Sequence, residues 1–262
     1  MDEITDFPLT APTAPSFRLD GKKALVTGSS RGIGFAAAAA LAQAGANVML
    51  AARSSEDLQA ACRAITKQGG SCDWFVLDVA DSKAVTKEVA SRGPFDVLIN
   101  SAGMNRPKEL LDVPDQDLDD VFALNVKAAF YLARETARGM LEAKIQGSII
   151  NISSAMGLVG SPRRTVYCAS KHALEGMTKA LAWELGKAGI RVNTIVPCFV
   201  ETAFTANFFK EPGFREWVTS RIAFGRVARP EDYMGAAVFL ASDASTMMTG
   251  TALVIDGGWT AV

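Results

Sequence analysis

The chain has 262 residues, of which 49% are hydrophobic, so it can bury a substantial core within one domain. Its 27 basic and 28 acidic side chains give a formal net charge of −1, which disfavours nucleic acids and anionic membrane surfaces as partners. A small-molecule substrate is the expected partner.

The cysteines and the N-terminal sequence favour a cytoplasmic protein. The four cysteines have no C-x-x-C spacing and fit free thiols in a reducing compartment. Residues 1–7 lack the basic and apolar regions of a secretory signal. The longest apolar run, residues 35–42, is far shorter than the roughly 20 residues that cross a bilayer, so no membrane span is expected.

The pattern along the chain predicts an α/β fold. Residues 1–18 hold three prolines and no amphipathic period, which indicates an N-terminal arm before a catalytic domain at residues 19–262. Strands are predicted at residues 23–27, 47–51, 73–77, 97–100, 148–152, 191–196 and 253–256. Helices are predicted at residues 33–44, 56–68, 82–91, 115–143, 167–187 and 230–241. This alternation predicts a doubly wound, parallel, seven-stranded sheet with helices on both faces, in a single domain.

A glycine-rich turn follows the first predicted strand and leads into an alanine-rich helix. This order is typical of a dinucleotide site, where glycines let the backbone approach the pyrophosphate and the helix N-terminus attracts its charge. The spacing is G-x-x-x-G-x-G rather than the commonest G-x-G-x-x-G, and a turn that serves only packing is the alternative. The candidate phosphate-binding residues are Gly28, Ser30, Arg31, Gly32, Ile33 and Gly34.

The segment after the second predicted strand indicates which dinucleotide binds. A carboxylate there would bind the ribose 2′-hydroxyl of NAD, whereas an arginine suits the 2′-phosphate of NADP. This chain has Arg53 at that place, and Arg31 in the glycine-rich turn can join it in binding the phosphate. NADP is therefore the predicted cofactor, and two solvated surface arginines are the alternative.

Two further patterns indicate proton-transfer chemistry. Tyr167 and Lys171 stand four residues apart in a predicted helix, so their side chains share a face and the ammonium can lower the pKa of the phenol. Ser153 and Ser154 end a predicted strand, where a hydroxyl can hydrogen-bond a substrate oxygen. A tyrosine and a lysine at this spacing also occur by chance in many helices, so the pair indicates a catalytic site only together with the other motifs.

These motifs together resemble the short-chain dehydrogenase/reductase family. The resemblance rests on TGSSRGIG at 27–34, NSAG at 100–103, ALNVKAAF around Asn125, the ISS strand end, YCASK at 167–171, VNTIVP and IDGGW. It covers about residues 19–262 and implies a Rossmann-like fold. It also implies hydride transfer between NADP(H) and a carbonyl or secondary alcohol. Ser101 and Cys198 depart from the family's usual residues, and neither belongs to its catalytic four.

The resemblance implies roles for single residues. Tyr167 would exchange a proton with the substrate oxygen that Ser154 orients, while Lys171 would bind the nicotinamide ribose and lower the tyrosine pKa. Asn125 would hold a water that links the lysine to bulk solvent. The further cofactor contacts that it implies are Asp78 and Val79 at the adenine, Asn100, Ala102 and Gly103 along the central stretch, and Pro197, Val200 and Thr202 near the carboxamide.

Residues at about 198–229 resemble the family's substrate lid, which closes over the reacting carbon and excludes water. The segment carries many aromatic side chains, and for each one packing inside the lid is expected before substrate contact. Arg106, Arg163 and Arg164 occupy loops that can border the pocket, where an arginine would suit a carboxylate. The aromatic residues are Phe199, Phe204, Phe208, Phe209, Phe214, Trp217 and Phe224.

The loops are similar to those of gluconate 5-dehydrogenase-like members, which favours a sugar acid or polyol substrate. Reduction of a 3-oxoacyl thioester is the alternative within the family, and a non-catalytic NADP-binding sensor is a more remote one. The only histidine, His172, is expected to have a packing or surface role, and no metal site is predicted. By resemblance, a homotetramer is expected through residues 115–143 and 167–187 and the last strand.

Overall fold

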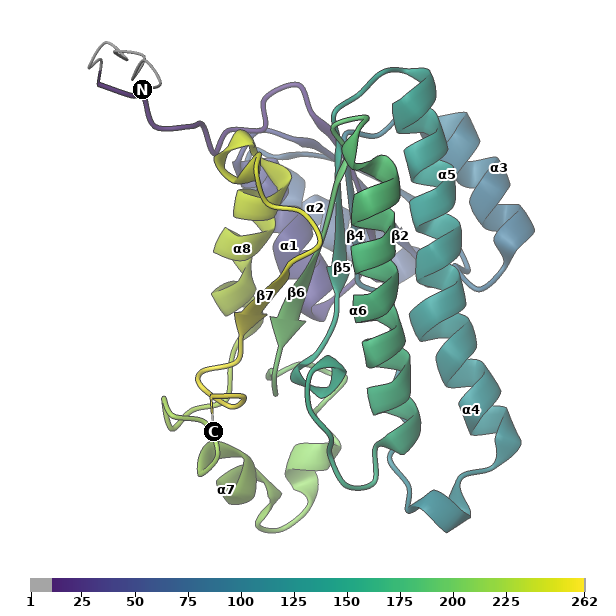
Figure 1. The fold of residues 1–262 in the computed structure, drawn as a ribbon, viewed down its shortest axis with the longest axis vertical. Helices are drawn as coiled ribbons and strands as arrows, with labels where there is room; N and C mark the ends of the chain where they lie inside the picture. The colour runs from purple at the N-terminus through teal and green to yellow at the C-terminus, as the bar shows by residue number, and fades with distance from the viewer. Residues whose placement is uncertain (1–10, 262) are drawn as a thin grey trace, which may run out of the picture.

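A computed structural model describes residues 11–261 of the chain. Its centre is a parallel sheet with the strand order β3-β2-β1-β4-β5-β6-β7 (Figure 1). Every pair of neighbouring strands runs parallel, so each connection crosses over a face of the sheet. The strands are β1 (Lys23–Thr27), β2 (Asn47–Ala52), β3 (Ser71–Val76), β4 (Val97–Asn100), β5 (Ser148–Ile152), β6 (Arg191–Pro197) and β7 (Ala252–Ile255).

Helices cover both faces of the sheet (Figure 1). They are α1 (Gly32–Gln43), α2 (Ser55–Lys67), α3 (Ser82–Arg92), α4 (Asp115–Phe122), α5 (Ala128–Glu142), α6 (Thr165–Gly186), α7 (Phe214–Thr219) and α8 (Met234–Ala241). Short 3-10 helices lie at Leu110–Asp112, Ala155–Gly157, Phe208–Lys210, Pro230–Tyr233 and Asp243–Ser245. Helices α1, α2 and α8 pack on one face, and α3, α5 and α6 on the other. Among residues 11–261, no helix is long and apolar enough to cross a membrane.

The strands are buried on both faces, and their side chains alternate between two apolar clusters. In β1, Leu25 packs on the side of α3, α5 and α6, whereas Val26 packs on the side of α1, α2 and α8. Leu98 and Ile99 of β4 repeat this alternation, and all four side chains are fully buried. Burial of each such side chain contributes about 1.5–3 kcal/mol to folding.

The predicted α/β class, parallel seven-stranded sheet and single domain are confirmed, and the strand ends differ from the prediction by at most two residues. The prediction of one regular helix over residues 115–143 is wrong, because a π-helical turn at Ala123–Lys127 separates α4 from α5. This turn holds the buried Asn125, whose side chain forms hydrogen bonds outside the helix. These bonds offset the poorer backbone geometry of a π-turn. Helix α7, with six residues, was too short for its period to be recognised.

The predicted N-terminal arm is only partly described, because residues 1–10 lie outside the described residues. Residues 11–18 are exposed and form no helix or strand. Phe17 packs on Phe239 of α8 with ring centroids 6.3 Å apart, and Leu19 is the first fully buried side chain of the described chain. The described part of the arm therefore contacts the domain through Phe17.

The strand order reverses between β1 and β4, and this reversal leaves a crevice at the carboxyl ends of the strands. A line of buried amides and a hydroxyl supports the crevice from below. Asn100 Nδ2 donates to Asn151 Oδ1 (2.9 Å), and Asn151 Nδ2 donates to Thr178 Oγ1 (2.8 Å). These bonds hold β4, β5 and α6 in fixed positions beneath the crevice.

Candidate active site

A cleft of about 390 Å³ lies at the carboxyl ends of the strands. It joins the glycine-rich turn after β1 to the start of α6 and to the segment after β6. Two residues of the predicted site, Asn100 and Asn125, do not line it. The predicted residues that do line it are Gly28, Ser30, Arg31, Gly32, Ile33, Gly34, Arg53, Asp78, Val79, Ala102, Gly103, Ser154, Tyr167, Lys171, Pro197, Val200 and Thr202.

Side chains are disfavoured at the glycines of the turn for different physical reasons. Gly28 and Gly32 both have φ 62°, which disfavours other residues. A Cβ on Gly28 would lie 2.7 Å from the Ala102 nitrogen, and one on Gly34 would lie 2.5 Å from the Gly28 oxygen, so these two glycines allow close packing. A Cβ on Gly32 would meet only Thr202, at 3.4 Å across the cleft. The turn therefore serves packing at Gly28 and Gly34 and leaves room in the cleft at Gly32.

The first turn of α1 presents backbone N–H groups that no side chain caps. Arg31 is the N-cap residue, and its side chain accepts no hydrogen bond from the helix. Ser29, by contrast, is fully buried and binds β1 to β2, because its Oγ donates to the Val26 oxygen (2.8 Å) and accepts from the Ala51 nitrogen (3.1 Å). The uncapped N–H groups and the helix dipole make this end of the cleft suited to a phosphate.

Arg31 and Arg53 both line the cleft, and both are exposed. Neither forms an ion pair with another residue in the part of the chain that the structure describes. Asp57 also lines the cleft, and the Ser54 hydroxyl caps α2 by accepting from its nitrogen (3.3 Å). Two cationic side chains and one carboxylate thus surround the mouth of the cleft beyond β2.

Tyr167, Lys171 and Ser154 form one wall of the cleft. Tyr167 and Lys171 are one helical turn apart on α6, and Lys171 Nζ lies 5.7 Å from the centroid of the tyrosine ring. Nζ donates to the Ile152 oxygen at the end of β5 (2.8 Å). Ser154, two residues further, accepts from the Met156 nitrogen (3.2 Å). The end of β5 therefore positions both the ammonium and the hydroxyl.

Burial controls the charge of the two titratable groups in this wall. Desolvation lowers the pKa of Lys171 to about 8, although the Glu175 carboxylate opposes this change. Desolvation also raises the pKa of Tyr167 to about 12, against the effects of the Ser154 hydroxyl and the Arg164 guanidinium. The expected lowering of the tyrosine pKa by Lys171 is therefore not found, because desolvation of the phenol is the largest effect and Lys171 is not among the groups that act on it.

Asn125 does not line the cleft but is hydrogen-bonded to Met104, which does. Its Nδ2 donates to the Met104 oxygen (2.9 Å) and to Ser170 Oγ (3.0 Å), and its Oδ1 accepts from the Met104 nitrogen (2.8 Å). A Cβ on Gly103 would lie 3.3 Å from Asn125 Oδ1 and 3.8 Å from Lys171 Nζ. Asn125 therefore fixes the loop after β4 against α6, and its part in holding a water stays a prediction.

The sequence analysis missed Glu175, one turn beyond Lys171 on α6. Its side chain is buried, and Oε2 accepts from Thr194 Oγ1 of β6 (3.1 Å). Glu175 is the charged group that opposes the lowering of the Lys171 pKa. The spacing of Tyr167, Lys171 and Glu175 at four-residue intervals could have revealed it. His172, on another face, is exposed, and its Nδ1 hydrogen-bonds the Cys168 oxygen (2.9 Å).

Four of the seven predicted lid aromatics form a cluster with Trp259, namely Phe199, Phe209, Phe214 and Trp217. Phe199 lies at its centre, with ring centroids 5.2 Å from Trp259 and 5.7 Å from Phe214. Of the seven predicted lid aromatics, only Phe204 lines the main cleft. These four residues pack together, whereas Phe204 and Phe224 are exposed at 46% and 76%.

Lys171→Met should raise the free energy of unfolding of the cofactor-free protein at pH 7 by about 1–3 kcal/mol, because it removes a desolvated charge. The folded chain binds Lys171's proton less tightly than the unfolded chain, so the wild type should gain stability as the pH rises from about 8 to the ordinary lysine value of 10.5. Urea denaturation at several pH values measures the difference. Lys179→Met, an exposed change on the same helix, is the control. If the variant's higher free energy of unfolding, relative to the wild type, stayed constant up to pH 10.5, that result would contradict a buried charge at Lys171.

Comparisons with known proteins show which family the chain belongs to. The family model described as enoyl-(acyl carrier protein) reductase matches residues 28–260. Gluconate 5-dehydrogenase of Gluconobacter oxydans is 38% identical over 93% of this chain and 96% of its own length. The 3-oxoacyl-[acyl-carrier-protein] reductase of Thermotoga maritima is 39% identical over 92% of this chain and 98% of its own length.

The solved structures include a gluconate 5-dehydrogenase from Burkholderia cenocepacia J2315 in complex with NADP and tartrate. It is similar to this chain with a TM-score of 0.89 and 34% identity, over 94% of this chain and 98% of that chain. Both the sequence and the fold are thus shared over nearly the whole length. The chain therefore belongs to the short-chain dehydrogenase/reductase family.

Proposed function

We propose that the chain is an NADP(H)-dependent oxidoreductase that interconverts a carbonyl and a secondary alcohol, with a sugar acid or polyol as substrate. The observation that carries this proposal is one cleft in which Tyr167, Ser154 and Lys171 line the same space as the glycine-rich turn. The gluconate 5-dehydrogenase relatives, one of them bound to NADP and tartrate, support the choice of cofactor and substrate class.

The residues of the cleft suit NADP. The uncapped N-terminus of α1 would receive the pyrophosphate, and Arg31 and Arg53 would bind the 2′-phosphate. Asp78 and Val79 would border the adenine, whereas Lys171 would bind the nicotinamide ribose and Thr202 the carboxamide. When bound, the nicotinamide supplies or accepts the hydride.

In reduction, the Tyr167 hydroxyl would donate its proton to the substrate oxygen while the carbonyl carbon receives the hydride; oxidation is the reverse. A pKa of about 12 keeps the phenol protonated at neutral pH, which suits the donor role. Ser154 would hold the substrate oxygen next to the phenol. Lys171, with its proton held near Ile152, would stabilise the phenolate that remains.

NADPH should bind more tightly than NADH, and Arg53→Ala should weaken NADPH binding about tenfold while leaving NADH binding nearly unchanged. The reason is that only NADPH carries a 2′-phosphate for the guanidinium, whereas the pyrophosphate is common to both nucleotides. Fluorescence titration of each nucleotide measures the effect. Arg63→Ala, an exposed change on α2 away from the cleft, is the matched control. Tighter binding of NADH by the wild type would overturn the cofactor assignment.

Tyr167→Phe should reduce turnover by at least about a hundredfold and change NADPH affinity by less than twofold, because it removes one proton donor and little volume. The NADPH absorbance is followed with sugar acids, polyols, simple ketones and a 3-oxoacyl thioester. Retained turnover in the variant would exclude Tyr167 as the acid.

Reduction of a 3-oxoacyl thioester remains the second candidate, supported by the Thermotoga maritima relative. A clear preference of the wild type for the thioester in the same substrate series would favour it over a sugar acid. A non-catalytic NADP-binding sensor would bind NADPH without turnover of any substrate. The combination of Tyr167, Ser154 and Lys171 in the cleft disfavours that alternative, because nucleotide binding alone needs no proton donor.

The domain plan and the location are also proposals. Residues 19–262 would form the catalytic domain after an arm at 1–18, and residues at about 198–229 would close over the substrate as a lid. The four cysteines are free in the structure, which supports a reducing compartment such as the cytoplasm.

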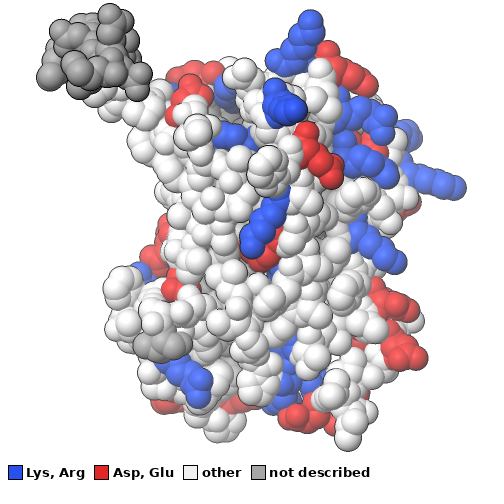
Figure 2. Space-filling view, in the orientation of Figure 1, with Lys and Arg blue, Asp and Glu red and all other residues white. Residues whose placement is uncertain are grey.

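A homotetramer is proposed on the face formed by α5 and α6. Trp183, Phe130 and Leu141 are exposed there, at 89%, 41% and 48%. Much of the central surface in this view carries no charged side chain (Figure 2). Light scattering should give a mass near four chains, and Trp183→Glu should lower it, because a charge would be buried at the contact. A wild-type mass near one chain would contradict this assembly.

A further inference from the structure

The arginines near the substrate end of the cleft differ in whether a carboxylate neutralises them. Arg106 is fully engaged, because its Nη1 lies 2.6 Å from Asp117 and its Nη2 lies 2.8 Å from Asp120. Lys108 adds a second positive charge to Asp117 at 2.7 Å. This group holds the loop after β4 against α4 and pairs the Arg106 guanidinium with two carboxylates.

The next two arginines precede α6. Arg163 has a half-exposed side chain and lies 3.7 Å from Glu109 and 4.0 Å from Glu211. Its φ of 61° is unusual for a residue with a side chain, and its oxygen accepts from the Lys108 nitrogen (2.9 Å). Arg164 is only 8% exposed and forms no ion pair with any residue of the described chain. A buried guanidinium without an anion is costly unless something else balances its charge.

The Glu211 carboxylate favours the charged form of Arg164 but forms no ion pair with it, so the charge is balanced only in part. Its hydrogen bonds run from Nη1 alone, to Ser161 Oγ and the Pro162 oxygen, and both are 3.5 Å long. The guanidinium carbon lies 5.6–5.9 Å from three aromatic ring centroids, which hold it by cation–π contacts. Desolvation lowers the pKa of Arg164. The rings are those of Phe199, Phe208 and Phe214.

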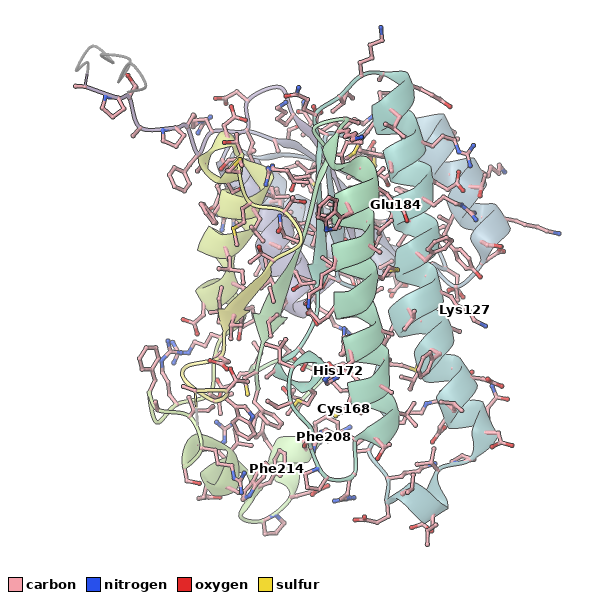
Figure 3. The ribbon with its side chains drawn as sticks, viewed as in Figure 1. Lys127, Cys168, His172, Glu184, Phe208 and Phe214 are labelled. Carbon is pink, nitrogen blue, oxygen red and sulfur yellow. The ribbon has the colours of Figure 1, made fainter. Side chains whose placement is uncertain are left out.

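A second cavity, of about 180 Å³, opens beside this guanidinium. Pro107, Phe208, Phe214 and Trp217 line it together with the arginine. In Figure 3, Phe208 and Phe214 lie close to the end of α6 that carries Cys168. The volume is roughly ten times what one water requires. Arg163 and Glu211 also line the cavity, and their charges face each other. The cavity therefore offers the Arg164 guanidinium beside aromatic and proline side chains, together with the Arg163–Glu211 pair.

Arg164 is also close to the proposed proton donor. It is the N-cap residue of α6, three positions before Tyr167, so the two residues lie on the same side of the helix start. Its charge favours the ionised form of the Tyr167 phenol. Tyr167 packs against the aromatic cluster that contains Phe199, and the Arg164 guanidinium lies over the same Phe199 ring, so the proton donor and the cation contact one cluster.

We propose that Arg164 binds the carboxylate of the substrate in this second cavity and thereby selects sugar acids over neutral polyols. The proposal rests on the proposed function, in which Tyr167 marks the reacting oxygen. A carboxylate would supply the anion that the buried guanidinium lacks and would accept a bidentate pair of hydrogen bonds from it. The aromatic side chains of the cavity would reduce the exposure of the pair to water and so strengthen it. The aromatic rings would keep the guanidinium in place before the substrate arrives.

Arg164→Met removes the charge but keeps an unbranched chain that can pack among the rings. Binding of D-gluconate and of its neutral counterpart D-glucitol to the enzyme saturated with NADP⁺ is measured by calorimetry, and turnover is followed by NADPH absorbance. Arg164→Met should weaken gluconate binding about thirtyfold without weakening glucitol binding. Arg164→Lys should recover part of the gluconate affinity. Arg215→Met is the matched control, since Arg215 stacks on Phe209 but is paired with Glu201 at 2.6 Å.

Each outcome separates this proposal from the proposed function. Equal gluconate binding by the wild type and Arg164→Met, or no gluconate binding by the wild type, would overturn the role of Arg164. Turnover of neutral alcohols with NADP⁺ in the same experiment would leave the oxidoreductase assignment standing. Gluconate binding that depends on Arg164, without turnover of any substrate, would instead sink the proposed function and keep the carboxylate site. A similar loss in Arg215→Met would show a general charge effect and would also overturn the proposal.

Discussion

The parallel direction of all seven strands is the constraint on which the rest of the structure depends. It buries the sheet on both faces, so the strands must be apolar and the connections must be helices. It also brings every strand's carboxyl end to one edge. The glycine-rich turn after β1, the serines after β5 and the segment after β6 meet at that edge because of this direction, although they are far apart in the sequence.

The start of α6 brings two buried cations to this edge of the sheet. Lys171 points into the cleft wall and is held by the Ile152 oxygen, while Arg164 is held by aromatic rings at the start of the same helix. Neither has a carboxylate within hydrogen-bond distance in the described chain. Such charges reduce stability, and their retention fits a site in which negatively charged groups of ligands complete the pairing.

Much of the fold was predictable because its signals are local. The period and length of the apolar runs predicted the strands. The glycine-rich turn after β1 predicted the end of the cleft that is suited to a phosphate. The helix over residues 115–143 was predicted wrongly, because the π-turn at Ala123–Lys127 arises from bonds of Asn125 to Met104 and Ser170, which are distant in sequence. Asn100 was expected in the cleft, yet it is bonded to Asn151 beneath the sheet edge.

The sequence by itself determined the class of fold, the family and, apart from Asn100 and Asn125, the predicted residues that line the cleft, since spacing within one strand, turn or helix decides which side chains share a face. Only the tertiary structure decided the electrostatics. Desolvation depends on which segments cover a group, so the opposite pKa shifts of Tyr167 and Lys171 could not be derived from their spacing. The same reason separates the three loop arginines: their sequence context is similar, and only packing leaves Arg164 buried without a carboxylate, whereas Arg106 and Arg163 have acidic partners.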